Sequence, residues 1–341
     1  MEKDLYQQTT RVLCLTLISL LISACSPDGN NNAVNDSAQQ TADSFPSQSS
    51  PTQAATTQTA IPGQAPGQGS EEKPTVIWAK PGFAPLFISE EPFKGEGTGD
   101  LIFQTLQTLL PQFNHVNTKA NYTRIIAEMK KGTDICALLF YNETREDFAV
   151  YSDPLAITPS YHIYASLEGK AALDKAFGRN LSQAPLDELL SKSGDLSLLI
   201  TPHQSYGKKR DDLLAKHKDS LNTQLHLTDL PAMMKIVATN RAQLMLAMPW
   251  VFNYEQDNLG LHGRTAKIEL TDVPAYQASY LVCSKNPLGR QVVATINNID
   301  PAAHTVLKDA MASWLLPEEH QDYYRAYREY FAAYASGQAP K

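Results

Sequence analysis

The residues that could carry enzyme chemistry are spread thinly along this chain. Its eight histidines are scattered, and none stands in the His-Glu-x-x-His spacing that holds a catalytic zinc ion. No Gly-x-Ser-x-Gly motif marks a nucleophile at a strand-to-helix turn. His203 and Ser205 could serve as base and nucleophile, but the sequence places no acid beside them. We therefore predict no catalytic residue, no metal site and no cofactor, and we expect a protein that is not an enzyme.

Thiol chemistry is the second possibility, because the chain has four cysteines. Cys136 and Cys283 both lie in short apolar segments that are typical of buried strands. Neither has a histidine or another cysteine nearby to complete a metal site. In an oxidising compartment these two residues would form a disulfide, and the alternative is a pair of buried free thiols.

The first 24 residues have the organisation of a secretion signal. An apolar run of about ten residues begins at Val12, shorter than the ~20 residues that a bilayer span needs. It ends in Leu-Ile-Ser-Ala-Cys, which resembles a bacterial lipobox. The resemblance implies cleavage before Cys25 and lipidation of its sulfur, while Cys14 leaves with the signal. The alternative is an ordinary secretory signal followed by a chance cysteine.

The segment after the predicted cleavage site is low in complexity. Residues 25–73 are rich in Asn, Gln, Ser, Thr, Ala, Pro and Gly, so they cannot bury enough apolar surface to offset their ordering entropy. We predict a disordered tether that holds a folded domain off a membrane. Ser26, rather than Asp, follows the lipidated cysteine, and by resemblance to enteric lipoproteins this favours the outer over the inner membrane. The expected location is therefore periplasmic and lipid-anchored.

The composition is that of a globular protein with a sizeable core. Of 341 residues, 43% are hydrophobic and 19% are charged, and the net charge is −7. A mildly acidic chain without a basic stripe has no electrostatic footprint for nucleic acid, so we exclude that class of partner. We expect a monomer.

Strand and helix patterns alternate from Thr75 onward. Expected strands cover residues 75–79, 114–120 and 134–139, and expected helices cover 100–110 and 122–131, the second ending at Gly132. This order predicts parallel βαβ units.

A second set of the same kind follows in the chain. Expected strands cover residues 195–200, 225–227, 243–248 and 275–283, and expected helices cover 205–217, 230–240, 288–298 and 301–315. Four tyrosines at helical spacing, Tyr323, Tyr327, Tyr330 and Tyr334, predict a final helix that packs through one face. Two α/β sets of similar pattern suggest two lobes with a cleft between them.

Four short motifs in this order resemble a known family: Lys80-Pro-Gly-Phe-Ala-Pro-Leu, Gly99-Asp100, Thr144-Arg145 and Tyr151-Ser152-Asp153-Pro154. They are similar to the first lobe of type 2 periplasmic binding proteins, the family-3 extracellular solute-binding class, in an uncharacterised branch with one cysteine in the third strand and another near the return crossing. The resemblance covers about residues 75–315. It implies an α/β fold of two lobes with a central cleft and a two-strand hinge. The crossings fall near residues 160–165 and 275–280, with lobe one at 74–160 plus 281–341 and lobe two at 161–280.

The resemblance also implies three ligand contacts. Phe83 falls where the class places an aromatic ring against the ligand. Arg145 falls on the arginine that grips an α-carboxylate, and Ser205 on the hydroxyl residue that helps to bind it. Alternatively, Arg145 forms a surface ion pair with Glu143 or Asp147, and Phe83 is an ordinary core residue.

Departures from the family pattern change the expected ligand. Lys80 stands where amino-acid binders carry an aspartate for the ligand's ammonium group, and Met248 stands where the second lobe offers another. Phe140, Tyr141 and Trp250 add aromatic lining, although Trp250 could also be a core residue. We therefore predict an anionic or partly aromatic small molecule rather than a standard amino acid.

These residues together favour one function and leave two alternatives open. The expected ligand-binding residues are Lys80, Phe83, Tyr141, Arg145, Ser205 and Trp250. The favoured function is solute capture between two lobes, with a permease of an ABC-type importer as a partner. The alternatives are a ligand-sensing or cell-envelope lipoprotein without transport, and a lyase that acts in the cleft.

Overall fold

The computed structural model describes residues 72–224, 229–299 and 301–339. The predicted signal, the lipidation site at Cys25 and almost all of the predicted tether lie outside the described residues, as does the strand expected at 225–227. Within the described ranges, no helix combines the length and the apolar character that a membrane crossing requires.

The first sheet has five strands in the order β2-β1-β3-β11-β4. The strands are β1 (Thr75–Lys80), β2 (Asn114–Lys119), β3 (Ile135–Phe140), β4 (Ala149–Pro159) and β11 (Tyr276–Ser284). β1 pairs in parallel with β2 and β3, which confirms the βαβ prediction, and β11 is antiparallel to β3 and β4. The connecting helices are α2 (Thr98–Thr108) and α3 (Tyr122–Lys131), and α3 ends at Gly132 in the left-handed conformation as predicted.

The second sheet has six strands in the order β6-β10-β5-β9-β7-β8. The strands are β5 (His162–Ser166), β6 (Gln183–Ala184), β7 (Ser197–Leu199), β8 (Asn222–Gln224), β9 (Leu244–Ala247) and β10 (Thr265–Leu270). Five helices belong to this part of the chain: α4 (Leu167–Phe177), α5 (Leu186–Lys192), α6 (Lys208–His217), α7 (Leu230–Ala238) and α8 (Pro249–Leu259). The sequence did not predict α4, α5, α8, β6 or β10.

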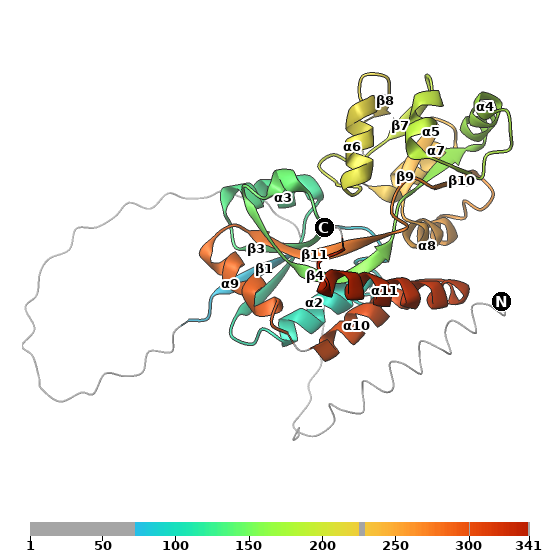
Figure 1. Ribbon diagram of the computed structural model, residues 1–341. Coiled ribbons are helices and arrows are strands. Elements are labelled where there is room, and N and C mark those ends of the chain that lie inside the picture. The colour runs from blue at the N-terminus through green and yellow to red at the C-terminus, as the bar shows by residue number, and fades with distance from the viewer. Residues whose placement is uncertain (1–71, 225–228, 300, 340–341) are drawn as a thin grey trace, which may run out of the picture. The chain divides into compact units, whose positions relative to one another are not determined.

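Two chain segments connect the two sheets. The first lies between β4 and β5, and the second lies between β10 and β11 (Figure 1). They are side by side, because the Ser160 N–H donates a 2.9 Å hydrogen bond to the Ala275 carbonyl. The buried Arg210 guanidinium donates to one carbonyl in each segment, at 3.3 Å to Tyr161 and 3.1 Å to Pro274. The lobe boundaries predicted at residues 160/161 and 280/281 remain a prediction.

The chain ends in three helices: α9 (Pro287–Ile296), α10 (Pro301–Ala312) and α11 (His320–Ala335). α10 packs against α2, although about 200 residues separate them (Figure 1). In α11, Tyr323 and Tyr327 are buried, and the Tyr323 hydroxyl donates to the Ile157 carbonyl of β4 at 3.3 Å. The predicted tyrosine face is therefore confirmed for Tyr323 and Tyr327, whereas Tyr330 and Tyr334 are only partly buried.

A disulfide joins Cys136 of β3 to Cys283 of β11. The two residues are direct register partners in neighbouring antiparallel strands, and both are buried. The disulfide prediction is thus confirmed, and the alternative of two free thiols is not. The bond closes a loop of 147 residues that contains the whole second sheet.

Candidate functional site

A small, mostly apolar cavity lies where segments from both sheets meet. Its volume is about 50 Å³, enough for a few water molecules. It is lined by Phe83, Leu86, Thr98, Ile102, Tyr122, Leu138, Leu139, Phe140, Arg145, Ala156, Ile157, Thr158, Tyr161, Gln204, Ser205, Met248, Trp250, Ser279 and Met311. We call it the Arg145 cavity, because Arg145 is the one formally charged residue in this lining. Four of the six predicted binding residues therefore meet here: Phe83, Arg145, Ser205 and Trp250.

Arg145 is a buried cation without a counter-ion. It ends a short 3-10 turn (Glu143–Arg145) after β3, and only 5% of the residue is exposed. Its guanidinium donates to the carbonyls of Phe140 at 3.2 Å and His203 at 3.0 Å. No carboxylate among the described residues lies within ion-pair distance of it, so the surface ion pair with Glu143 or Asp147 is not formed. A buried charge that meets only neutral acceptors is poised to accept an anion.

The lining of the same cavity includes Trp250, whose indole N–H has no partner within the described ranges. Trp250 lies in the first turn of α8 and is 4% exposed, yet its Nε1–H meets no acceptor among the residues that the structure describes. Burying an unpaired N–H costs about 1–3 kcal/mol, which a ligand acceptor would recover. Phe83 and Met248 complete the apolar wall, and the Phe83 ring lies 6.2 Å from that of Tyr122.

Ser205 is held by a carboxylate rather than by a histidine. Its hydroxyl donates to Asp211 at 2.5 Å and accepts from the Gly207 N–H at 3.2 Å. Asp211 also accepts from the Tyr206 N–H at 2.8 Å. Burial raises the pKa of Asp211, while the two hydrogen bonds act in the opposite direction. Ser205 is therefore not paired with His203 as a nucleophile with its base. Its hydrogen bond to Asp211 instead fixes the loop that leads into α6.

Lys80 does not line the Arg145 cavity. Its ammonium forms a 2.7 Å ion pair with Asp100 at the start of α2. The other oxygen of Asp100 accepts from the Ile88 N–H at 2.8 Å. Because this carboxylate already neutralises Lys80, the structure does not place the lysine where a ligand anion would meet it.

Tyr141 also lies outside the Arg145 cavity. Phe140 lines that cavity, but Tyr141 lines another one of about 300 Å³, together with Tyr276, Tyr280 and Arg210. The Tyr141 hydroxyl donates to Glu146 at 2.7 Å, and this bond is the main reason that its pKa is raised to about 12. The aromatic lining predicted from Tyr141 is thus absent from the Arg145 cavity.

Sequence reasoning missed a polar pair in the cavity wall. Gln204 donates a 2.6 Å hydrogen bond to the hydroxyl of Tyr161, which lies in the first crossing. Burial raises the pKa of Tyr161 well above its ordinary value, so the hydroxyl stays neutral. Nothing in the local sequence marks these residues, because their contact depends on how two distant segments meet.

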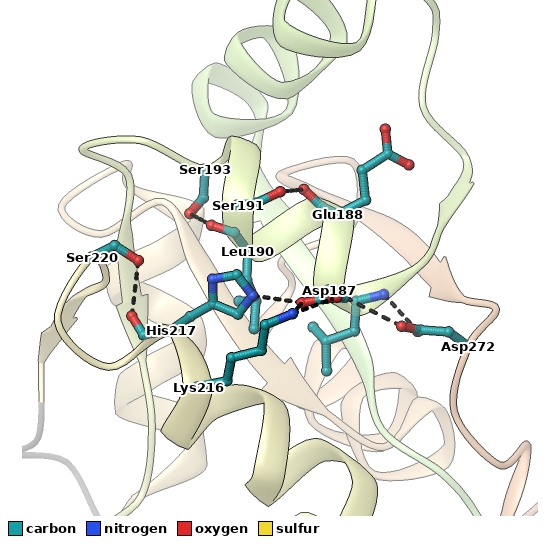
Figure 2. Close-up of polar contacts among 10 residues, drawn as sticks. Asp187, Glu188, Leu190, Ser191, Ser193, Lys216, His217, Ser220 and Asp272 are labelled. Atoms are coloured by element: carbon teal, nitrogen blue, oxygen red, sulfur yellow. Dashed lines mark hydrogen bonds and ion pairs between the residues drawn. The ribbon is translucent and has the colours of Figure 1, made fainter.

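A histidine–aspartate pair elsewhere in the second sheet's helices has a structural role. The His217 ring contacts Asp187 at 2.6 Å, and Lys216 contacts the same carboxylate at 2.8 Å (Figure 2). Ser220 donates to the backbone carbonyl of His217, so its hydroxyl is not aimed at the ring. The pair joins α5 to α6 and lacks a nucleophile. Across the described residues, no group of three His, Cys, Asp or Glu side chains could hold a metal ion.

The two mixed α/β sheets, the paired crossings and the cavity between them are those of the two-lobed type 2 periplasmic binding protein fold, and solved structures agree. The periplasmic VFT2 domain of BvgS from Bordetella pertussis is 18% identical, with a TM-score of 0.52 over 71% of this chain and 94% of that one. The substrate-binding protein AbpA of an amino acid ABC transporter from Streptococcus pneumoniae is 11% identical, with a TM-score of 0.51 over 72% and 97%. The GluR0 ligand-binding core from Nostoc punctiforme, solved with L-glutamate, is 13% identical, with a TM-score of 0.51 over 71% and 100%.

These similarities define the fold alone, because each identity is low. No family model matches the sequence, and no curated protein matches it either. The function therefore has to be argued from the site.

Proposed function

We propose that this protein captures a small carboxylate-bearing molecule, with an apolar or aromatic body, in the Arg145 cavity. The observation that carries the proposal is the buried Arg145 guanidinium without a counter-ion. A carboxylate would form charge-assisted bonds with it in place of the present bonds to neutral carbonyls. The unpaired Trp250 N–H supplies another donor, and Phe83, Phe140 and Met248 supply apolar contact for the ligand body.

The size of the cavity indicates that binding requires movement. A volume near 50 Å³ does not hold a ligand larger than a few waters. We propose that the two crossing segments act as a hinge and that the lobes move apart to admit the ligand. Arg145 would then exchange its bond to His203 for a bond to the ligand.

The same cavity disfavours the lyase alternative. Its lining contains no Asp, Glu, His or Lys that could act as a general acid or base. A binding role needs only the donors and the apolar wall that are present. We therefore retain the prediction that this protein is not an enzyme.

Two roles for the captured ligand remain, and the neighbours support both. AbpA is a substrate-binding protein of an importer, whereas BvgS VFT2 and a histidine kinase sensor domain share the same fold. We favour delivery to an ABC-type importer, with the protein acting as a periplasmic monomer that is anchored through a lipid on Cys25. Mass spectrometry of the N-terminal peptide tests the anchor, and membrane fractionation separates the roles. Enrichment in the inner membrane favours the importer, while enrichment in the outer membrane favours sensing without transport.

The binding proposal is tested by thermal-shift screening of matched ligand pairs. Phenylacetate and benzoate should raise the melting temperature, whereas phenylacetamide and benzamide, which lack the charge, should not. A ligand present at 100 times its dissociation constant adds about 2.7 kcal/mol to the unfolding free energy. L-Arginine, L-histidine and L-glutamine serve as the opposing set. Tight binding of any of these three, without binding of the carboxylates, would overturn the proposed ligand class.

A further inference from the structure

Another buried charged residue has no ion-pair partner among the described residues, and its charge is negative. Glu255 lies in the middle of α8 and is 7% exposed. Within the described part of the chain, no donor or cation is within bonding distance of its carboxylate. Burial is the main cause that raises its pKa to about 7, and the negative charges of Asp229 and Glu90 raise it further. Lys235 opposes them only weakly, so the molecule itself does not stabilise the ionised carboxylate.

Glu255 faces a cavity of about 400 Å³, which we call the Glu255 cavity. One wall is the loop after β1, which contributes Phe83, Phe87 and Glu90, and the opposite wall is α8, which contributes Tyr254 beside Glu255. The cavity is therefore much larger than the Arg145 cavity and richer in acidic groups. Aromatic faces next to a carboxylate suit an organic cation, because the ring quadrupole attracts positive charge.

The available cations do not fill this role. Lys119 lines the same cavity, but the residue is exposed and forms no ion pair with Glu255. The Lys80 ammonium lies 5.7 Å from the centre of the Phe87 ring, but it is paired with Asp100. A metal ion is also a poor fit, because the acidic side chains of the described residues nowhere gather in the threes that a metal site needs. An organic cation, with one positive charge on a carbon chain, therefore suits the cavity better than a metal ion.

We propose that the Glu255 cavity binds a small organic ammonium cation, whose charge pairs with Glu255 and whose carbon chain lies against Phe83, Phe87 and Tyr254. The site shares Phe83 with the Arg145 cavity, but Glu255 lines only the Glu255 cavity, and the proposal does not rest on the function assigned to Arg145. Because its walls come from both sides of the crossings, an occupied site would also link the loop after β1 to α8.

The charged groups around the cavity determine how binding depends on pH. Glu90, Glu91 and Asp229 are acidic, and Lys119 and Lys235 are basic. Burial and the neighbouring negative charges raise the pKa of Glu255 to about 7. A cation that pairs with its carboxylate must lower its pKa, so binding should strengthen as pH rises through about 7 and weaken below it.

The test is an NMR titration of the full chain with n-butylammonium as the probe. Carboxyl carbons of labelled glutamates report the titration midpoint of Glu255, assigned from the signal lost in Glu255→Gln and again in Glu255→Asp. Saturating butylammonium should lower the midpoint by about one pH unit or more, which corresponds to a tenfold preference for the ionised form. n-Butanol has the same chain without the charge and should leave the midpoint unchanged.

Variants decide whether the effect belongs to Glu255. Glu255→Gln should abolish the shifts that butylammonium causes in the aromatic signals of the cavity. Glu329→Gln, the same change at an exposed position on α11, should keep them. An unchanged midpoint in the wild-type protein would overturn the proposal, and so would aromatic shifts of equal size in Glu255→Gln.

Discussion

The Arg145 guanidinium donates a 3.0 Å hydrogen bond to the backbone carbonyl of His203, 58 residues further along the chain. Arg145 follows β3 of the first sheet, and His203 follows β7 of the second, so the bond crosses the cavity from one lobe to the other. A ligand carboxylate would be a stronger acceptor than this neutral carbonyl. In the proposed opening movement, this bond would break as the ligand carboxylate takes its place.

The first prediction concerns the disulfide between Cys136 and Cys283. Because the bond closes a 147-residue loop, removing it in Cys136→Ala/Cys283→Ala should lower the free energy of unfolding by about 2–5 kcal/mol. Urea unfolding measures the loss. Reductant should destabilise the wild-type protein to the same level and leave the double variant unchanged. Equal stability of the wild-type protein with and without reductant would show that the bond contributes little.

The second prediction concerns His162 in β5, whose Nδ1 accepts from the Leu270 N–H at 3.1 Å. Burial, aided by Lys267, lowers its pKa to about 4. Since the unfolded histidine titrates near 6.5, protonation favours the unfolded chain as pH falls from about 6.5 to 4. Because His162 is partly exposed, solvent screening reduces the effect, and we expect the free energy of unfolding to fall by about 1–2 kcal/mol. His162→Gln should reduce the difference between urea unfolding at pH 7 and at pH 5, and an unchanged difference would contradict this assignment.

The third prediction separates a binding role of Trp250 from a packing role. Trp250→Phe keeps an aromatic ring in the wall but removes the unpaired N–H. We expect carboxylate affinity to fall about 10-fold or more, because a hydrogen bond to a charged acceptor contributes about 1.5–3 kcal/mol. Trp314→Phe is the matched control, because Trp314 lies outside the Arg145 cavity and its N–H donates to the Glu96 carbonyl at 3.1 Å. Equal affinity losses in the two variants would assign Trp250 to packing alone.

Sequence patterns predicted the first lobe well because its signals are local. The helix at 122–131 has an amphipathic repeat, a capping Asn121 and a closing Gly132, and all three act within one or two turns. The helix expected from Ser205 begins at Lys208 instead. Gly207 adopts a φ of +94°, and a Cβ atom there would lie 2.6 Å from the Gln277 side chain, so a contact remote in sequence sets this boundary.

The candidate site was only partly predictable, for a related reason. The short turn after β3 positions Arg145, so its place could be predicted from the local Thr144-Arg145 motif. Lys80 is close in sequence to Phe83, and Tyr141 is close to Arg145, yet neither lines the Arg145 cavity. Asp100 forms an ion pair with Lys80, and Glu146 accepts a hydrogen bond from Tyr141. The isolation of Glu255 depends on a loop about 170 residues earlier, and no local pattern indicates it.

The central claim is that Arg145 binds a ligand carboxylate, and calorimetric titration with phenylacetate tests it most directly. Arg145→Lys keeps the charge but loses the planar pair of donors, so affinity should fall about 10–100-fold. Arg290→Lys, the same change at an exposed position on α9, should bind as the wild-type protein does. Wild-type binding that is lost in Arg145→Lys and kept in Arg290→Lys is the predicted result. Binding of equal strength in all three proteins would contradict the account.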